Sequence, residues 1–73
     1  MTAEEKIQFF KDIVDNKSFK EHDEMIVDLF TASYVVDILE ALNTENKQKL
    51  LSLSIRDMCL FCLKLANKIN SGV

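Results

Sequence analysis

The sequence predicts an all-α fold: a small orthogonal or bundle-like array of about four helices around a long, central second helix. The 73 residues include no proline and one glycine, Gly72, so turns that need glycine are absent from the body of the chain. Apolar residues recur at three- and four-residue spacing, and several segments begin with a helix-capping pattern. We therefore expect a single domain over residues 1–73, without a β-strand.

The first helix is expected over residues 3–15. Thr2 and Glu5 have the spacing of a capping box, in which the side chain of each residue bonds the backbone amide of the other. The polar stretch "DNKS" then interrupts the apolar spacing and ends the helix.

The second helix is expected near residues 20–42. Ser18 and Glu21 form another capping-box pattern, and Asp23 is a competing cap, so this helix should begin between residues 19 and 24. Its apolar residues cover more than half of its circumference, which predicts neighbours on more than one side.

Two further helices are expected over residues 45–51 and 55–70. Asn43 can close the second helix and Thr44 can cap the third, whereas Ser54 caps the last helix with Asp57 at its third position. The residues on the dominant apolar stripes should form the core: Leu29, Val36, Leu39, Met58, Cys62 and Ile69.

The stretch "ALNTENKQKLLSLSIRDMCLFCLKLANKI" resembles the closing segment of small helical hypothetical proteins of marine bacteriophages. The shared features are "ALNxEN", a following Lys and a helix of mixed apolar residues. The resemblance implies an all-helical protein made inside an infected bacterium, and it implies no functional residue.

The stretch "CLFC" is the pattern that most suggests chemistry. Cys59 and Cys62 would lie one turn apart on the same face of a helix, within reach of one metal ion. A structural zinc ion needs four Cys or His ligands, and the single His22 is far away in the sequence. The apolar neighbours favour core packing. Oxidation between molecules and metal binding are the alternatives, and we expect no metal and no cofactor.

Catalysis is not indicated. The cluster "EHDE" is interpreted as acidic residues that complement a helix N-terminus, and no nucleophile elbow or glycine-rich phosphate loop is present in the sequence. The expected function is therefore protein interaction and not an enzyme activity.

Self-association is the favoured mode of interaction, as a homodimer or small homo-oligomer. The second and last helices carry more apolar surface than short neighbours can cover. Tyr34 and Phe61 are the preferred anchors, since aromatic residues are enriched at interface centres. A separate, unidentified protein partner is the other possibility. The expected interface comprises Phe30, Tyr34, Val35, Ile38, Leu60, Phe61 and Leu65.

The charge is divided along the chain. Residues 1–40 hold ten acidic and four basic side chains (−6), whereas residues 41–73 hold two acidic and five basic ones (+3). The alternative function is a helix-turn-helix-like nucleic-acid-binding protein. The acidic first half would repel phosphates and disfavours it. The basic residues that suggest it are Lys47, Lys49, Arg56, Lys64 and Lys68.

The apolar runs are short. None approaches the roughly 20 residues that cross a bilayer, so no membrane association is expected. No signal peptide is recognised at the N-terminus, and the two cysteines are too few for a disulfide framework. These features lead us to expect a cytoplasmic protein, in a bacterial host if the bacteriophage resemblance holds.

Overall fold

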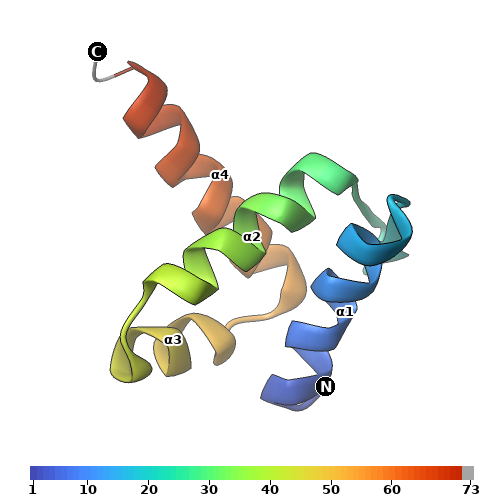
Figure 1. Ribbon diagram of the computed structural model, residues 1–73, viewed down its shortest axis with the longest axis horizontal. Helices are drawn as coiled ribbons and strands as arrows, with labels where there is room; N and C mark the ends of the chain where they lie inside the picture. Colours follow the sequence, from blue (N-terminus) through green and yellow to red (C-terminus); the bar gives the residue numbers. More distant parts are fainter. Residues whose placement is uncertain (72–73) are drawn as a thin grey trace.

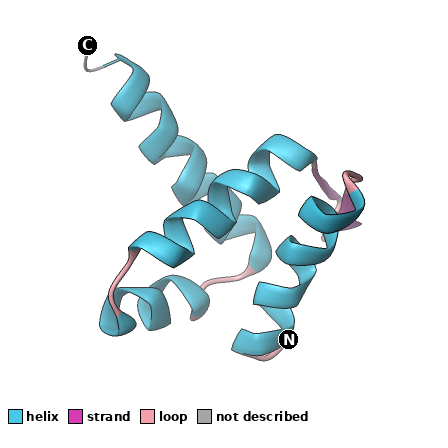
Figure 2. Cartoon of the chain, in the orientation of Figure 1, coloured by secondary structure: helices cyan, strands magenta, loops and turns pink. Residues whose placement is uncertain are grey.

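The computed structural model describes residues 1–71, which form four helices and one short hairpin (Figures 1 and 2). The helical fold class predicted from the sequence is confirmed, but the expectation that the chain contains no β-strand is wrong, because residues 20–27 form a two-stranded hairpin. The elements are, in order, α1 (Ala3–Asn16), β1 (Lys20–His22), β2 (Met25–Val27), α2 (Leu29–Ala41), α3 (Thr44–Leu51) and α4 (Ile55–Ser71).

Helix α2 is central, because it contacts both α1 and α4. Figure 1 shows α1 on one side of α2, α3 near the end of α2, and α4 passing behind α2 before it projects away from the rest of the molecule. At 13 residues, α2 is shorter than α4, which has 17. The predicted length of the second helix was therefore wrong, although its central place was right.

Helix α1 begins where the sequence predicts. Thr2 and Glu5 form the complete capping box, with the Glu5 amide donating to Thr2 Oγ1 over 3.1 Å and the Thr2 amide donating to Glu5 Oε1 over 3.0 Å. The helix ends at Asn16, and its C-cap Lys17 has a φ of 49°, in the left-handed region, which turns the chain toward β1.

Residues 20–27 form an antiparallel hairpin, so the expected start of the second helix between residues 19 and 24 is wrong. The pairs are Lys20 with Val27, Glu21 with Ile26, and His22 with Met25. Its turn consists of Asp23 and Glu24, with φ of 50° and 63°. Positive φ at both turn residues matches the twist of a tight hairpin, a conformation that normally selects Gly or Asn.

Contacts with α1 explain why a hairpin replaces the predicted helical turns. The ring of His22 lies edge-on to the ring of Phe9, with 5.6 Å between centroids, and Lys20 Nζ lies 5.4 Å from the Phe9 centroid. Lys20 also pairs with Asp12 of α1 at 3.4 Å, and Val27 is fully buried. These tertiary contacts outweigh the local capping pattern of the segment.

Asp28 caps α2 in place of the residues predicted from the sequence. Its carboxylate accepts a hydrogen bond from the Thr31 amide at 2.7 Å. This bond, and a further one with the Thr31 side chain, lower the pKa of Asp28 below its usual value. Because the pKa of Asp28 is lower in the folded than in the unfolded protein, the cap stabilises the fold at pH values above the pKa of Asp28 in the unfolded chain. This stabilisation is lost as the pH falls through the pKa of Asp28 in the folded protein.

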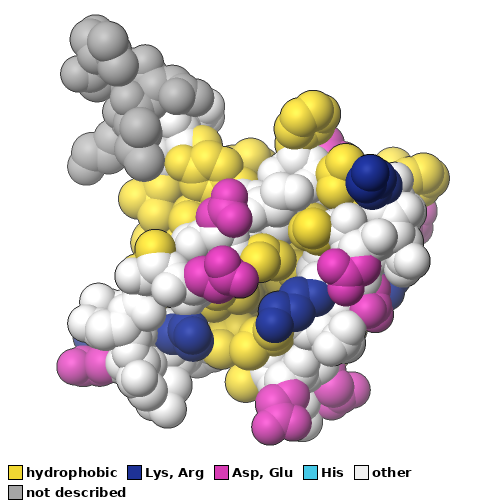
Figure 3. All heavy atoms as spheres, in the orientation of Figure 1, with side chains coloured by type: hydrophobic (Ala, Val, Ile, Leu, Met, Phe, Trp, Pro, Cys, Tyr) yellow, Lys and Arg dark blue, Asp and Glu magenta, His cyan; other side chains and the backbone are white. Residues whose placement is uncertain are grey.

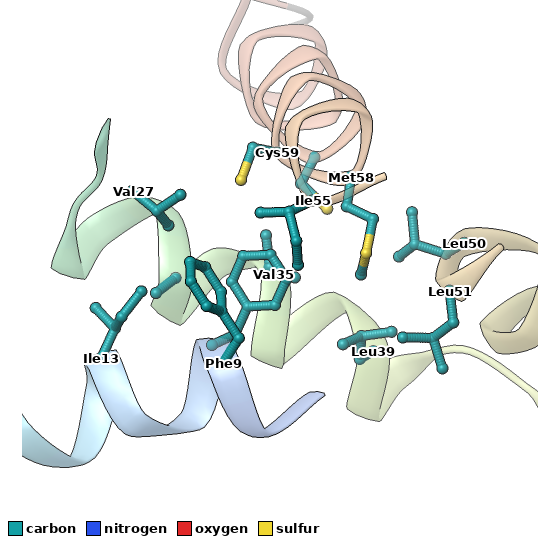
Figure 4. Packing of buried hydrophobic residues seen from close by; sticks show 13 residues of the cluster. Phe9, Ile13, Val27, Val35, Leu39, Leu50, Leu51, Ile55, Met58 and Cys59 are labelled. Atoms are coloured by element: carbon teal, nitrogen blue, oxygen red, sulfur yellow. The ribbon is translucent and has the colours of Figure 1, made fainter. Parts of the chain in front are cut away.

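The core is a single cluster of buried residues between α1, α2 and the start of α4, extended by β2 and α3 (Figure 4). Of the residues expected in the core, Leu39, Met58 and Cys62 are buried, whereas Leu29 and Val36 are only partly buried. The side chain of Ile69 lies outside the described part. The cluster consists of Phe9, Phe10, Ile13, Val27, Ala32, Val35, Leu39, Leu50, Leu51, Ile55, Met58, Cys59 and Cys62.

Truncation of Leu39 tests the placement of the core. Leu39→Ala should lower the free energy of unfolding by about 2–5 kcal/mol, because its side chain is 4% exposed and leaves a cavity between helices. The matched control is Leu63→Ala on α4, where the side chain is 37% exposed and the loss should be about 1 kcal/mol or less. Urea titration followed by circular dichroism measures both. Equal losses for the two variants would contradict the core assignment.

Glycine at the hairpin turn should stabilise the protein. Glu24→Gly removes the Cβ that opposes a φ of 63°, and we expect a gain of about 0.5–1 kcal/mol after the entropic cost of glycine. The control is Lys11→Gly, because Lys11 is exposed within α1. Glycine at this helical position should lower the free energy of unfolding by about 1 kcal/mol. The same urea titration applies. A Glu24→Gly variant as destabilised as the control would show that the turn is not left-handed.

Candidate interaction surface

An apolar groove lies between the end of α2, α3 and α4. Its volume is about 490 Å³. The residues that line it are Leu42, Asn46, Lys49, Leu50, Leu53, Phe61 and Leu65. Their side chains are apolar except for one amide and one ammonium group, a composition that suits a hydrophobic occupant with a polar edge.

Helix α3 forms one wall of the groove, and polar contacts fix both of its ends. Asn43 accepts a hydrogen bond from the Asn46 amide at 2.8 Å and so acts as the N-cap, one residue before the predicted Thr44. At the other end, Lys6 Nζ of α1 donates to the carbonyl oxygens of Leu51 and Leu53, at 2.8 and 2.7 Å. These contacts hold the turn after α3 against α1.

Helix α4 forms the other wall. It starts at the predicted cap, where the Asp57 amide donates to Ser54 Oγ at 3.1 Å. Phe61 and Leu65 are four residues apart and therefore lie on one flank, which faces the groove. The other flank carries Leu60 and Leu63, which are exposed. Figure 3 shows hydrophobic side chains gathered over the part of α4 that leaves the body of the molecule.

The residues of the expected interface fall into three groups. Phe30, Leu60 and Phe61 are exposed, whereas Tyr34, Ile38 and Leu65 are half-buried. Val35 is fully buried and belongs to the core, because α2 turns its Ala32–Val35–Leu39 side inward. Val35 is therefore corrected from a surface to a core position.

The groove unites part of this set with residues that were not expected in the interface. Phe61 and Leu65 belong to the expected set, and α2, α3 and the following turn contribute Leu42, Leu50 and Leu53. The spacing of leucines in "LLSL" marks an apolar patch, but their meeting with α4 depends on the turn between the helices. Phe30 is not in the lining of the groove.

A second exposed apolar surface lies on the hairpin and the start of α2. The side chains of Phe19, Ile26 and Phe30 are 67%, 62% and 85% exposed. Glu21 is paired with Ile26 and so shares its outward face of the hairpin. The exposed acidic residues of this segment are Glu21, Asp23, Glu24 and Asp28. Figure 3 shows hydrophobic side chains along this edge of the molecule, with a basic side chain among them and acidic side chains around them.

The two cysteines lie in the core, as predicted. Both side chains are fully buried and both thiols are free; Figure 4 shows Cys59 and its neighbours at the contact between α4 and the rest of the core. Burial raises the pKa of each thiol to about 11, and the charges of Cys62 and Asp28 add to this effect at Cys59. Within residues 1–71, no group of three or more potential ligands is placed to hold a metal ion.

None of the helices described is long and apolar enough to span a membrane. Comparisons with family models, curated proteins and solved structures find nothing that matches this chain.

The thiols should react slowly in the native protein. At pH 8, a thiol with a pKa of about 11 is ionised roughly one hundredth as often as one with a pKa of 9.0, and burial also blocks the reagent. Labelling with a disulfide reagent should be slow in buffer and fast in urea. The control is Lys64→Cys in a Cys59→Ala/Cys62→Ala background, where the exposed position should react at once. Fast labelling of the folded parent would contradict the burial of both thiols.

Proposed function

We propose that this chain is a non-enzymatic protein-interaction domain that self-associates as a homodimer or small homo-oligomer. The observation that carries the proposal is the apolar groove between α2, α3 and α4, with Phe61 45% exposed at its edge. A folded chain gains free energy when another molecule covers such a surface, because apolar area leaves water.

The amount of exposed apolar surface supports association in preference to a plain monomer. Several large apolar side chains are exposed among the described residues, although the whole chain exposes only 5160 Å². They occur on the hairpin, on α2 and on α4, so more than one contact is available. The exposed large apolar residues are Met1, Phe19, Ile26, Phe30, Leu60, Phe61 and Leu63.

The association should be weak. A standard interface buries about 800 Å² of accessible surface on each partner, which is a large share of the surface of so small a molecule. Association also costs about 4–15 kcal/mol in lost translational and rotational freedom. The groove offers a few apolar side chains to offset this cost. We therefore expect dissociation constants in the micromolar range or above.

The groove supports a binding role and not catalysis. Among the described residues that line it, Asn46 and Lys49 supply the polar side chains. Two such groups do not provide a nucleophile, a base and an oxyanion site together. The bacteriophage resemblance adds a second class of partner to the proposal, a protein of an infected bacterial cytoplasm.

Nucleic-acid binding is the alternative, since α3, a short turn and α4 follow one another as in a helix-turn-helix. A recognition helix presents polar and basic side chains to the groove of DNA. The exposed side chains of α4 include Leu60, Phe61 and Leu63. This apolar surface favours the protein-interaction proposal, and salt-dependent DNA binding in a gel shift would favour the alternative.

Sedimentation equilibrium from about 1 µM to about 1 mM tests self-association. The weight-average mass should rise above the monomer mass of 8.4 kDa with concentration. Phe61→Ala should weaken association roughly tenfold, because it removes the aromatic edge of the groove. Leu63→Ala, on the opposite flank of α4, is the matched control and should change it less than about twofold. A folded parent that stays monomeric throughout would refute the proposal.

A further inference from the structure

We propose that self-association is head-to-tail: the outer face of the hairpin and the first turn of α2 in one copy dock into the α3–α4 groove of the next copy. This inference rests on the proposed self-association and names the two surfaces that meet. The first surface, called the hairpin face below, comprises Phe19, Glu21, Asp23, Glu24, Ile26 and Phe30.

Shape is the first argument for unlike surfaces. The groove is hollow, and two hollow surfaces brought together by a two-fold axis leave the space between them unfilled. The hairpin face instead presents protruding side chains, because Phe30 is 85% exposed and Ile26 is 62% exposed. An apolar residue that protrudes can fill a groove, whereas a second groove cannot.

Charge is the second argument. Lys49 lines the groove, and Lys64 is exposed on α4 next to Leu65. The acidic residue of α3 is Glu45, whose Oε1 lies 3.6 Å from Lys49 Nζ and whose side chain is largely exposed. Two grooves in contact would bring like charges together. On the hairpin face, Asp23 and Glu24 line a hollow together with Arg56 of the same chain, whereas Glu21 lies beside Ile26 on the outward side and is exposed. A head-to-tail contact therefore pairs Glu21 with the basic edge of the groove around the apolar centre.

Separate positions of the two surfaces have a consequence for assembly. The groove is built from the end of α2, α3 and α4, whereas the hairpin face is built from the segment between α1 and α2 together with the start of α2 (Figure 1). A copy that uses its hairpin face still has a free groove. Contacts of this heterologous kind extend into open chains or close into rings.

Two variants separate this arrangement from a two-fold dimer. The hairpin variant is Ile26→Ser/Phe30→Ser, and the groove variant is Lys49→Glu/Phe61→Ser. Each keeps one surface and loses the other, so that neither should self-associate in sedimentation equilibrium. An equimolar mixture should form a one-to-one heterodimer with the affinity of the parent contact. The heterodimer should not grow further, because its one contact uses the intact groove of one variant and the intact hairpin face of the other.

Other outcomes are informative. A hairpin variant that associates as tightly as the parent would overturn the head-to-tail contact and leave self-association standing. A monomeric parent would overturn both proposals. A mixture that fails to pair although the parent associates would overturn the head-to-tail contact alone.

Circular dichroism checks that each variant folds. If Phe61→Ser disturbs α4, the single charge reversal Lys49→Glu replaces it, since the Lys49 side chain is 70% exposed. Lys49→Glu should weaken self-association several-fold. The double variant Lys49→Glu/Glu21→Lys should recover self-association, because the reversed charges pair again in every contact. No recovery, with the double variant folded, would count against the proposed pairing of these two surfaces.

Discussion

The contact between the first two turns of α4 and the rest of the core is the one on which the structure depends most. Ile55, Met58, Cys59 and Cys62 are all buried there, and together they supply the side of the core opposite α1. Small thiol side chains at two of these positions let α4 approach α2 closely, which explains "CLFC" as packing and not as chemistry. The same contact fixes the direction of α4. Its later turns then continue past the core (Figure 1). Phe61 and Leu65 of this helix line the groove.

The Lys6 ammonium group adds a long-range constraint to this packing. Carbonyl groups at the end of a helix lack partners within it, and a cation near them is favourable both as a hydrogen-bond donor and against the helix dipole. Lys6 supplies this donor from α1 to the carbonyls of Leu51 and Leu53. The first and third helices are thereby connected at the point where the chain turns into α4. The wall of the groove is consequently positioned by a residue far from it in the sequence.

Local features of the fold could be predicted from the sequence, and features set by distant contacts could not. The caps at Thr2 and Ser54 depend on residues within one turn, so their spacing was sufficient. Ser18 offered the same pattern, but packing of the following segment on Phe9 produced a hairpin with a turn that contains no glycine. Val35 was wrongly assigned to the surface. The inward-facing side of α2 depends on where the helix starts and on its contacts with α1 and α4, which the sequence pattern does not reveal. The groove likewise required the meeting of three elements.

The uneven distribution of charge becomes more informative once the fold is known. A net charge of −3 makes two copies repel at a distance, but physiological salt screens charges separated by more than about 8 Å. Close pairs between an acidic hairpin face and a basic groove edge are screened less, so they select orientation more than they add affinity. Added salt would then weaken a head-to-tail contact, because it screens the attraction between opposite charges. It would strengthen a contact between two groove surfaces, because it screens the repulsion between their lysines. The salt dependence of association therefore reports which surfaces meet, independently of any substitution.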